Sequence, residues 1–104
     1  MKFFNLAIAT IVLTAAIPAM AAGNPSEGAN KVSLCAACHS PNGISINPLW
    51  PNLAGQKAAY LAKQIRAFRD GERTEPTMQP FVGNLSDQEI DDLAAHFSEL
   101  TPCP

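Results

Sequence analysis

The chain has 104 residues, a formal net charge of −2 and a hydrophobic fraction of 47%. This length corresponds to one small domain and leaves no room for a second core of independent size. Only seven basic residues stand against nine acidic ones, so the chain lacks the clustered positive charge that binding to phosphates requires. A nucleic-acid partner is therefore not expected.

The N-terminal segment is typical of a secretory leader. Lys2 supplies the basic start, residues 3–22 carry no charge, and Ala19-Met20-Ala21 forms a small-residue cleavage pattern. We expect a cleavable signal peptide at 1–21 and a folded domain at 22–104. An uncleaved membrane anchor is the alternative, because about 20 apolar residues can just span a bilayer.

The composition of residues 22–104 indicates an all-α fold with too few apolar side chains to complete its core. This part contains two Val, four Ile and three Thr, too few β-branched side chains for a sheet protein. It also contains only five aromatic residues, which places it near the lower limit for a self-sufficient hydrophobic core. A disulfide, a metal or a cofactor is therefore expected to fill the interior.

Helical periodicity and capping signals predict three amphipathic helices. Asn24 is placed to cap the first, with Glu27 able to reach back to that cap. Gly71 is placed to end the second, and Ser86 opens the third with a capping box. The helices are expected over about 24–38, 57–70 and 86–100, joined by Pro- and Gly-rich loops at 40–55 and 72–85.

The pentapeptide CAACH at 35–39 is the pattern for covalent attachment of a c-type haem. The thiols of Cys35 and Cys38, three residues apart, can each add to a vinyl group on one side of the porphyrin. His39, directly after the second thiol, can then bind the iron from one face. The motif therefore predicts one covalent haem c as the missing part of the interior.

Two other interpretations of the motif are weaker. A thioredoxin-like redox pair would lie where a strand meets a helix, and no strand is expected here. A structural zinc site would need His96 and Cys103 as its remaining ligands. These two residues are seven apart, which is not a usual second ligand pair.

Met78 is the expected ligand on the other face of the haem. It is the only Met after the leader, and it lies in a loop between Pro76 and Pro80 that stiffen its approach. The alternative is a loop Met that packs against apolar surface. His96 is the rival iron ligand, although a role in packing between helices is expected for it.

These features together resemble a small class I c-type cytochrome, and most closely one haem unit of the bacterial tandem di-haem cytochromes c. The resemblance rests on CAACH, WPNLAGQ, the single loop Met and DQEIDDLAAHF, and it covers about 26–100. It implies a class I cytochrome c fold, with about three main helices and loops wrapped around the haem. It also implies that the Pro51 carbonyl accepts a hydrogen bond from Nδ1–H of His39. Gly28 would let the first and last helices approach, with Phe97 or His96 opposite.

The resemblance suggests further residues near the haem. Tyr60, Gln64 and Arg73 match positions near the haem edge and are candidate propionate contacts, with ordinary packing as the alternative. Trp50 is expected to lie against the macrocycle, with simple core packing as the alternative. Cys103 is the odd cysteine, and the sequence leaves open whether it is a free thiol or forms an intermolecular disulfide.

Ligation by His39 and Met78 would leave no open position on the iron, so the expected function is one-electron transfer rather than catalysis. We expect an exported, periplasmic carrier between respiratory redox partners that dock at the exposed haem edge. No small-molecule substrate is expected. Association with a membrane is expected only through partner complexes. The alternatives are a haem enzyme or ligand sensor with a labile sixth site, and an electron-transfer subunit of a larger dehydrogenase or oxidase.

Overall fold

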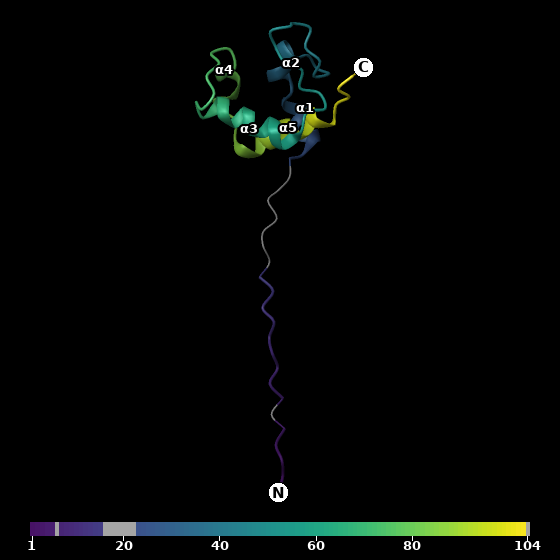
Figure 1. Cartoon of the computed structure of the whole chain (residues 1–104), viewed down its shortest axis with the longest axis vertical. Helices are drawn as coiled ribbons and strands as arrows, with labels where there is room; N and C mark the ends of the chain where they lie inside the picture. Colours follow the sequence, from purple (N-terminus) through teal and green to yellow (C-terminus); the bar gives the residue numbers. More distant parts are fainter. Residues whose placement is uncertain (6, 16–22, 104) are drawn as a thin grey trace.

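The computed structural model describes residues 1–5, 7–15 and 23–103. Within them, α3 and α5 lie at the base of the domain, while α2 and α4 stand above them as separate projections (Figure 1). The described residues contain no strand, as the composition predicts. The helices are α1 (Pro25–Lys31), α2 (Ser33–His39), α3 (Ala58–Arg69), α4 (Gln79–Val82) and α5 (Asp87–Glu99).

The described part of the N-terminal segment, 1–5 and 7–15, has no helix or strand and extends away from the helical domain (Figure 1). No described helix has the length and apolar character needed to cross a membrane. The expected cleavage pattern at 19–21 lies outside the described residues. Leader removal therefore stays a prediction.

Helix α5 forms the centre of the core. Ile90, Leu93 and Phe97 recur at helical spacing on one face and are almost fully buried. The predicted capping box is present, because the Glu89 N–H donates to Ser86 Oγ at 3.1 Å and the Ser86 N–H donates to Glu89 Oε1 at 3.3 Å. The local sequence therefore fixes where this helix begins, and its apolar face packs on α1 and α3.

Gly28 is the point where α1 meets α5. A Cβ atom at this position would collide with the carbonyl oxygen of Asp92 and lie 2.8 Å from the Cβ of His96. The close approach of the two helices therefore requires glycine here. Of the two residues expected opposite Gly28, the structure places His96 there.

The start of α1 is held both by the side chain of its own cap residue and by α5. The Asn24 side chain accepts hydrogen bonds from the N–H groups of Ser26 and Glu27, as expected for a cap. The prediction that Glu27 bonds back to the cap is wrong. The Asn24 N–H instead donates to Oδ1 of Asp92 at 2.8 Å, because α1 docks onto α5 beside this buried carboxylate.

Asp92 is expected to make the stability of this contact depend on pH. Hydrogen bonds from the Asn24 N–H and from the Gln88 side chain hold the pKa of Asp92 below its usual value. Its contribution is therefore present above the unfolded pKa of about 4 and is lost as the pH falls through the lower folded pKa. Asp92→Asn should lower the free energy of unfolding at pH 7 by about 1 kcal/mol.

Urea denaturation of the haem-loaded protein from pH 7 to pH 3 measures this effect. The difference between wild type and Asp92→Asn should shrink towards the acid end. Glu99→Gln, which removes one carboxylate from an exposed position of the same helix, is the matched control. An Asp92→Asn curve parallel to wild type at every pH would contradict the assignment.

Two features of the helices differ from the prediction. The expected first helix is divided at Val32, so that α1 packs on α5 while α2 carries the CAACH motif separately. The loop at 72–85 contains the four-residue α4, which the periodicity did not predict. Pro80, in the first turn of α4, is the local signal that favours a helix start there.

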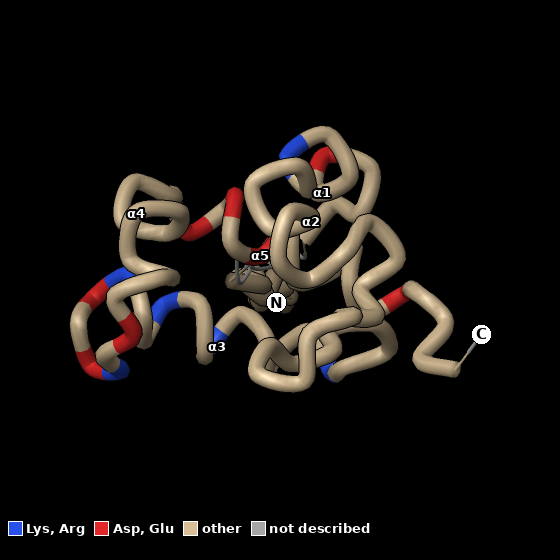
Figure 2. Tube along the Cα trace, turned by 90° about the horizontal axis from the view of Figure 1, so that it is seen from above, with Lys and Arg blue, Asp and Glu red and all other residues tan. Residues whose placement is uncertain are grey.

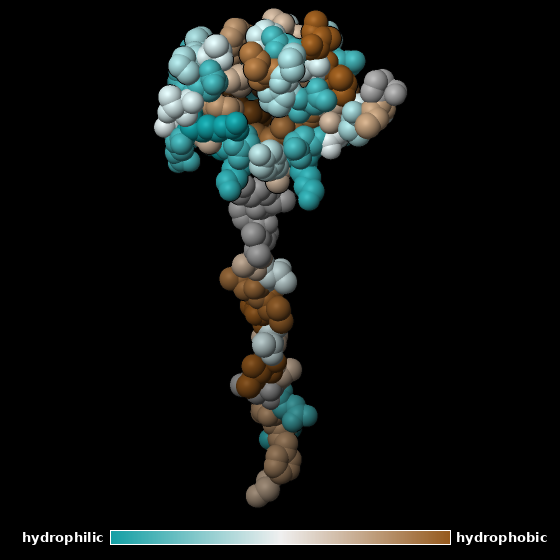
Figure 3. All heavy atoms as spheres, turned by 45° about the horizontal axis from the view of Figure 1, so that its top comes forward, coloured by the Kyte–Doolittle hydropathy of each residue, from teal (hydrophilic) through white to brown (hydrophobic). Residues whose placement is uncertain are grey.

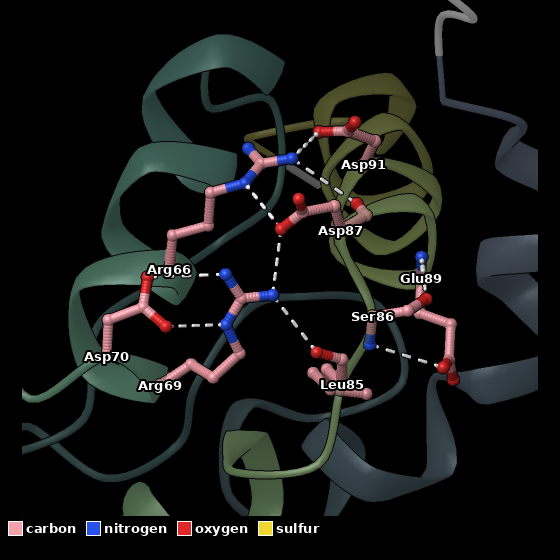
Figure 4. Close-up of polar contacts among 8 residues, drawn as sticks. All are labelled: Arg66, Arg69, Asp70, Leu85, Ser86, Asp87, Glu89 and Asp91. Carbon is pink, nitrogen blue, oxygen red and sulfur yellow. Dashed lines mark hydrogen bonds and ion pairs between the residues drawn. The ribbon is translucent and has the colours of Figure 1, made fainter.

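Helices α3 and α5 are joined at one end by charged side chains (Figure 4). Arg66 bonds Asp91 and Arg69 bonds Asp87, each at 2.8 Å, and Arg69 also bonds Asp70 at 2.8 Å. The guanidiniums of Arg69 and Arg66 lower the pKa of Asp87. Because Asp70 and Asp87 are exposed and the other three groups are only half-buried, these ion pairs define the register of the two helices more than they stabilise the contact.

Candidate haem site

Helix α2 presents the CAACH motif to a cavity of about 970 Å³. Cys35, Cys38 and His39 all line this cavity, and the two cysteines are not joined by a disulfide. Burial, and secondarily the neighbouring Cys38, raises the pKa of Cys35 to about 11. The Cys35 thiol is therefore protonated at neutral pH, and the absence of a disulfide leaves it available for addition to a vinyl group.

The orientation of His39 is set by a residue twelve positions later. Nδ1 of His39 lies 2.8 Å from the carbonyl oxygen of Pro51, and the imidazole is buried. A carbonyl can only accept, so Nδ1 carries the proton and donates this bond. Nε2 is thus the nitrogen left to bind iron, in the arrangement that improves an imidazole as a ligand.

Met78 lies on the other projection, directly before α4 (Figure 1). Its side chain is half-buried, lines the same cavity as His39 and contacts the hydrophobic core. Its backbone is held by a hydrogen bond from the Met78 N–H to the Glu75 carbonyl at 3.0 Å. The structure therefore brings the one thioether of 23–103 to the cavity that contains the imidazole and both thiols.

His96, the rival ligand, does not line the cavity. It lies against Gly28 in the contact between α1 and α5, with its ring edge-on to Phe97 at 5.3 Å between centroids. Its Nε2 is buried and has no hydrogen-bond partner among the described residues. This placement agrees with the packing role expected from the sequence.

The unpartnered Nε2 predicts that His96→Phe stabilises the protein. An unsatisfied buried nitrogen costs about 1–3 kcal/mol, and phenylalanine keeps an aromatic ring at this position while removing both ring nitrogens. The free energy of unfolding should rise by about 1 kcal/mol, as measured by urea denaturation, with the visible spectrum unchanged. A lower stability, or a spectrum that loses an iron ligand, would contradict this account of His96.

Residues of α3, α5 and the adjoining loops line the cavity. Hydrophobic side chains are visible inside it (Figure 3). Tyr60, Gln64 and Arg73, the candidate propionate contacts, all line it. Arg73 Nη1 donates to Gln64 Oε1 at 2.8 Å, and its guanidinium carbon lies 4.4 Å from the centroid of the Phe68 ring. Trp50 also lines the cavity and is 38% exposed.

Charge is distributed unevenly around this site. Residues 32–56 contain no Asp, Glu, Lys or Arg, so α2 and the loop after it are free of formal charge. The charged residues of the helical domain lie instead on α1, on α3 and the loop that follows it, and on α5 (Figure 2). Among the described residues that line the cavity, only Arg73 and Glu75 carry formal charge, which leaves a mostly apolar interior that suits a porphyrin.

The zinc alternative finds no support in the described part of the chain. No group of three or more His, Cys, Asp or Glu side chains there is arranged to hold a metal ion. Cys103 is exposed and forms no disulfide with Cys35 or Cys38. The helix that carries the motif also follows another helix and not a strand, unlike a thioredoxin-like site.

A family model described as Cytochrome c matches residues 26–101. The chain belongs to the cytochrome c family. Cytochrome c-554(548) of Halomonas halodenitrificans is 42% identical over 80 residues, which cover 74% of this chain and 96% of the relative. Cytochrome c4 of Pseudomonas aeruginosa is 40% identical over 96 residues, which cover 90% of this chain and 48% of the relative. The chain thus spans about half the length of that cytochrome c4.

Among solved structures, the thiosulfate dehydrogenase (TsdBA) of Marichromatium purpuratum matches with a TM-score of 0.69 and 32% identity. The match covers 75% of this cytochrome c and 19% of that chain. The class I fold and the resemblance to one haem unit of tandem cytochromes are confirmed. This cytochrome c domain binds one covalent haem c and serves haem-based electron transfer with redox protein partners.

Proposed function

We propose that this cytochrome c is an exported, periplasmic one-electron carrier whose haem is joined to Cys35 and Cys38 and ligated by His39 and Met78. The observation that carries the proposal is the shared cavity. It gathers the two thiols, an imidazole whose Nδ1 is already bonded, and the thioether of 23–103 around one apolar space.

The bound haem supplies a reversible one-electron couple at its iron. His39 and Met78 would occupy both axial positions, so no position is left for a substrate. Met78 offers a neutral thioether, which favours the ferrous state, and the apolar lining excludes water, which disfavours added positive charge. Both effects raise the reduction potential, and we expect a clearly positive value.

Electrons would enter and leave where the haem edge meets solvent. Tyr60, Gln64 and Arg73 line the cavity and would bind the propionates. Redox partners would dock there over the small, weak interface that suits rapid turnover. Association with membranes would occur only through such partner complexes.

The likeness to thiosulfate dehydrogenase supports a second arrangement with the same chemistry. In that structure the matching fold occupies 19% of the chain. Accordingly, this cytochrome c would exchange electrons with a larger dehydrogenase, either as its acceptor or as its bound subunit. Copurification of such a dehydrogenase with the native protein distinguishes the bound subunit from the mobile carrier.

Absorption spectroscopy separates a carrier from a haem enzyme or ligand sensor with a labile sixth site. The ferric protein should show a weak band near ~695 nm, expected from a thioether–iron bond, and the ferrous protein should not bind carbon monoxide readily. Absence of the band at neutral pH together with rapid carbon monoxide binding would contradict the proposal and favour the enzyme or sensor.

A further inference from the structure

The hydrogen bond between His39 and Pro51 joins two residues twelve positions apart, and Ser45 lies in the loop between them. The Ser45 N–H donates to Oδ1 of Asn52 at 2.8 Å. Its hydroxyl lies 3.4 Å from the carbonyl oxygen of Cys38. Ser45 therefore contacts Cys38, which precedes His39, and Asn52, which follows Pro51.

The hydroxyl of Ser45 also organises the middle of the loop. Oγ donates to the Asn47 carbonyl oxygen at 3.0 Å and accepts from the Asn47 N–H at 3.2 Å. A hydroxyl has one proton and two lone pairs, so its single proton is shared between the carbonyls of Cys38 and Asn47. The side chain is half-buried, which limits the water that could replace these partners.

Pro51 has no N–H, so its own backbone cannot donate a hydrogen bond that would fix the residue in place. Its neighbours do so instead. The Trp50 N–H donates to the Asn47 carbonyl at 3.0 Å, and the Leu53 N–H donates to the Gly43 carbonyl at 2.8 Å. The Asn52 side chain, directly after Pro51, is held by the hydrogen bond that its Oδ1 accepts from the Ser45 N–H.

We propose that Ser45 is a positioning residue for the axial imidazole. Its hydroxyl ties Cys38 to Asn47 and its backbone N–H holds Asn52, and together these bonds keep the Pro51 carbonyl against Nδ1–H of His39, which fixes the tautomer and the ring plane. This inference rests on the proposed ligation by His39. The Ser45 hydroxyl does not line the cavity, yet its removal should have a measurable effect on the iron.

The test uses Ser45→Ala in the full, haem-loaded protein, with two readouts. Exchange of the His39 Nδ1 proton with solvent, followed by NMR in the ferrous protein, should become about fivefold faster, the effect of losing one hydrogen bond. A looser Nδ1 bond also makes the imidazole a weaker donor, so the equilibrium constant for reduction against a reference couple should rise about twofold.

Ser45→Thr retains the hydroxyl and should restore both readouts. Ser98→Ala is the matched control, because Ser98 also donates from its hydroxyl to a backbone carbonyl, that of Ala95 at 2.8 Å, but on α5 away from His39. Circular dichroism shows whether Ser45→Ala still folds. If it does not, Asn52→Ala is the second variant, and it should also speed exchange of the His39 Nδ1 proton.

Unchanged proton exchange and unchanged reduction in both Ser45→Ala and Asn52→Ala would overturn the proposal. Equal changes in Ser98→Ala would also overturn it, because they would show a general loss of stability. Failure of the proposed ligation has a different signature. The wild-type protein itself would then show no protected Nδ1 proton on an iron-bound imidazole.

Discussion

Replacing Met78 by alanine is expected to lower the reduction potential by well over ~100 mV while the haem stays attached. The attachment residues lie on α2, whereas Met78 precedes α4 on the other projection. The variant therefore removes the thioether that favours the ferrous state and leaves the thiols and His39 in place. Loss of the band near ~695 nm and entry of water or added ligands at the iron should accompany the change.

Gln79→Ala is the matched control for this experiment, because Gln79 follows Met78 directly but does not line the cavity. Its spectrum and potential should equal those of wild type. If Met78→Ala left both quantities unchanged, another residue would have to bind the iron. His96 would be the first candidate to test, through the double variant with His96→Phe.

Replacing both Cys35 and Cys38 by alanine is expected to abolish covalent attachment and, with it, the folded state. The described chain buries few apolar side chains without the haem. They are Ala54, Leu61, Ala62, Val82, Leu85, Ile90, Leu93, Ala94 and Phe97. A small core of this kind, lining a cavity of about 970 Å³, offers too little burial to offset the conformational entropy of folding. Circular dichroism of the exported protein should show loss of most helix.

Cys103→Ala removes the third thiol, which is exposed and lies outside the cavity. This variant should keep its haem and its helical signal, so it separates the role of the CAACH thiols from that of cysteine in general. A Cys35→Ala, Cys38→Ala protein that remained well folded and colourless would contradict the view that the haem completes the core.

The parts of the fold that the sequence predicted are those fixed by local chemistry. The capping box at Ser86 uses neighbours three residues apart, and Gly71 supplies the positive φ of +79° that ends α3. The role expected of Glu27 failed because its partner was taken by Asp92, 68 residues away from Asn24. Such long-range competition has no local signature in the sequence.

The same distinction holds for the site. The CAACH motif is contiguous, so its chemistry could be predicted from spacing alone. The positions of Met78 and Pro51 followed from counting residues and from the family resemblance. Ser45 was not predicted, because a serine in a loop carries no distinctive pattern. Its role depends on a fold that places Cys38 and Asn52 on either side of it.

Mass spectrometry of the exported protein tests the central claim most directly, that one haem is joined covalently to the CAACH motif. Residues 32–56 lack basic side chains, so trypsin should release 32–57 as one peptide that contains Cys35 and Cys38 but not Cys103. We predict an intact mass equal to residues 22–104 plus one haem, about 616 Da, with all of the added mass on this peptide. An intact chain without added mass, or added mass on the peptide 74–104 that contains Cys103, would contradict the account.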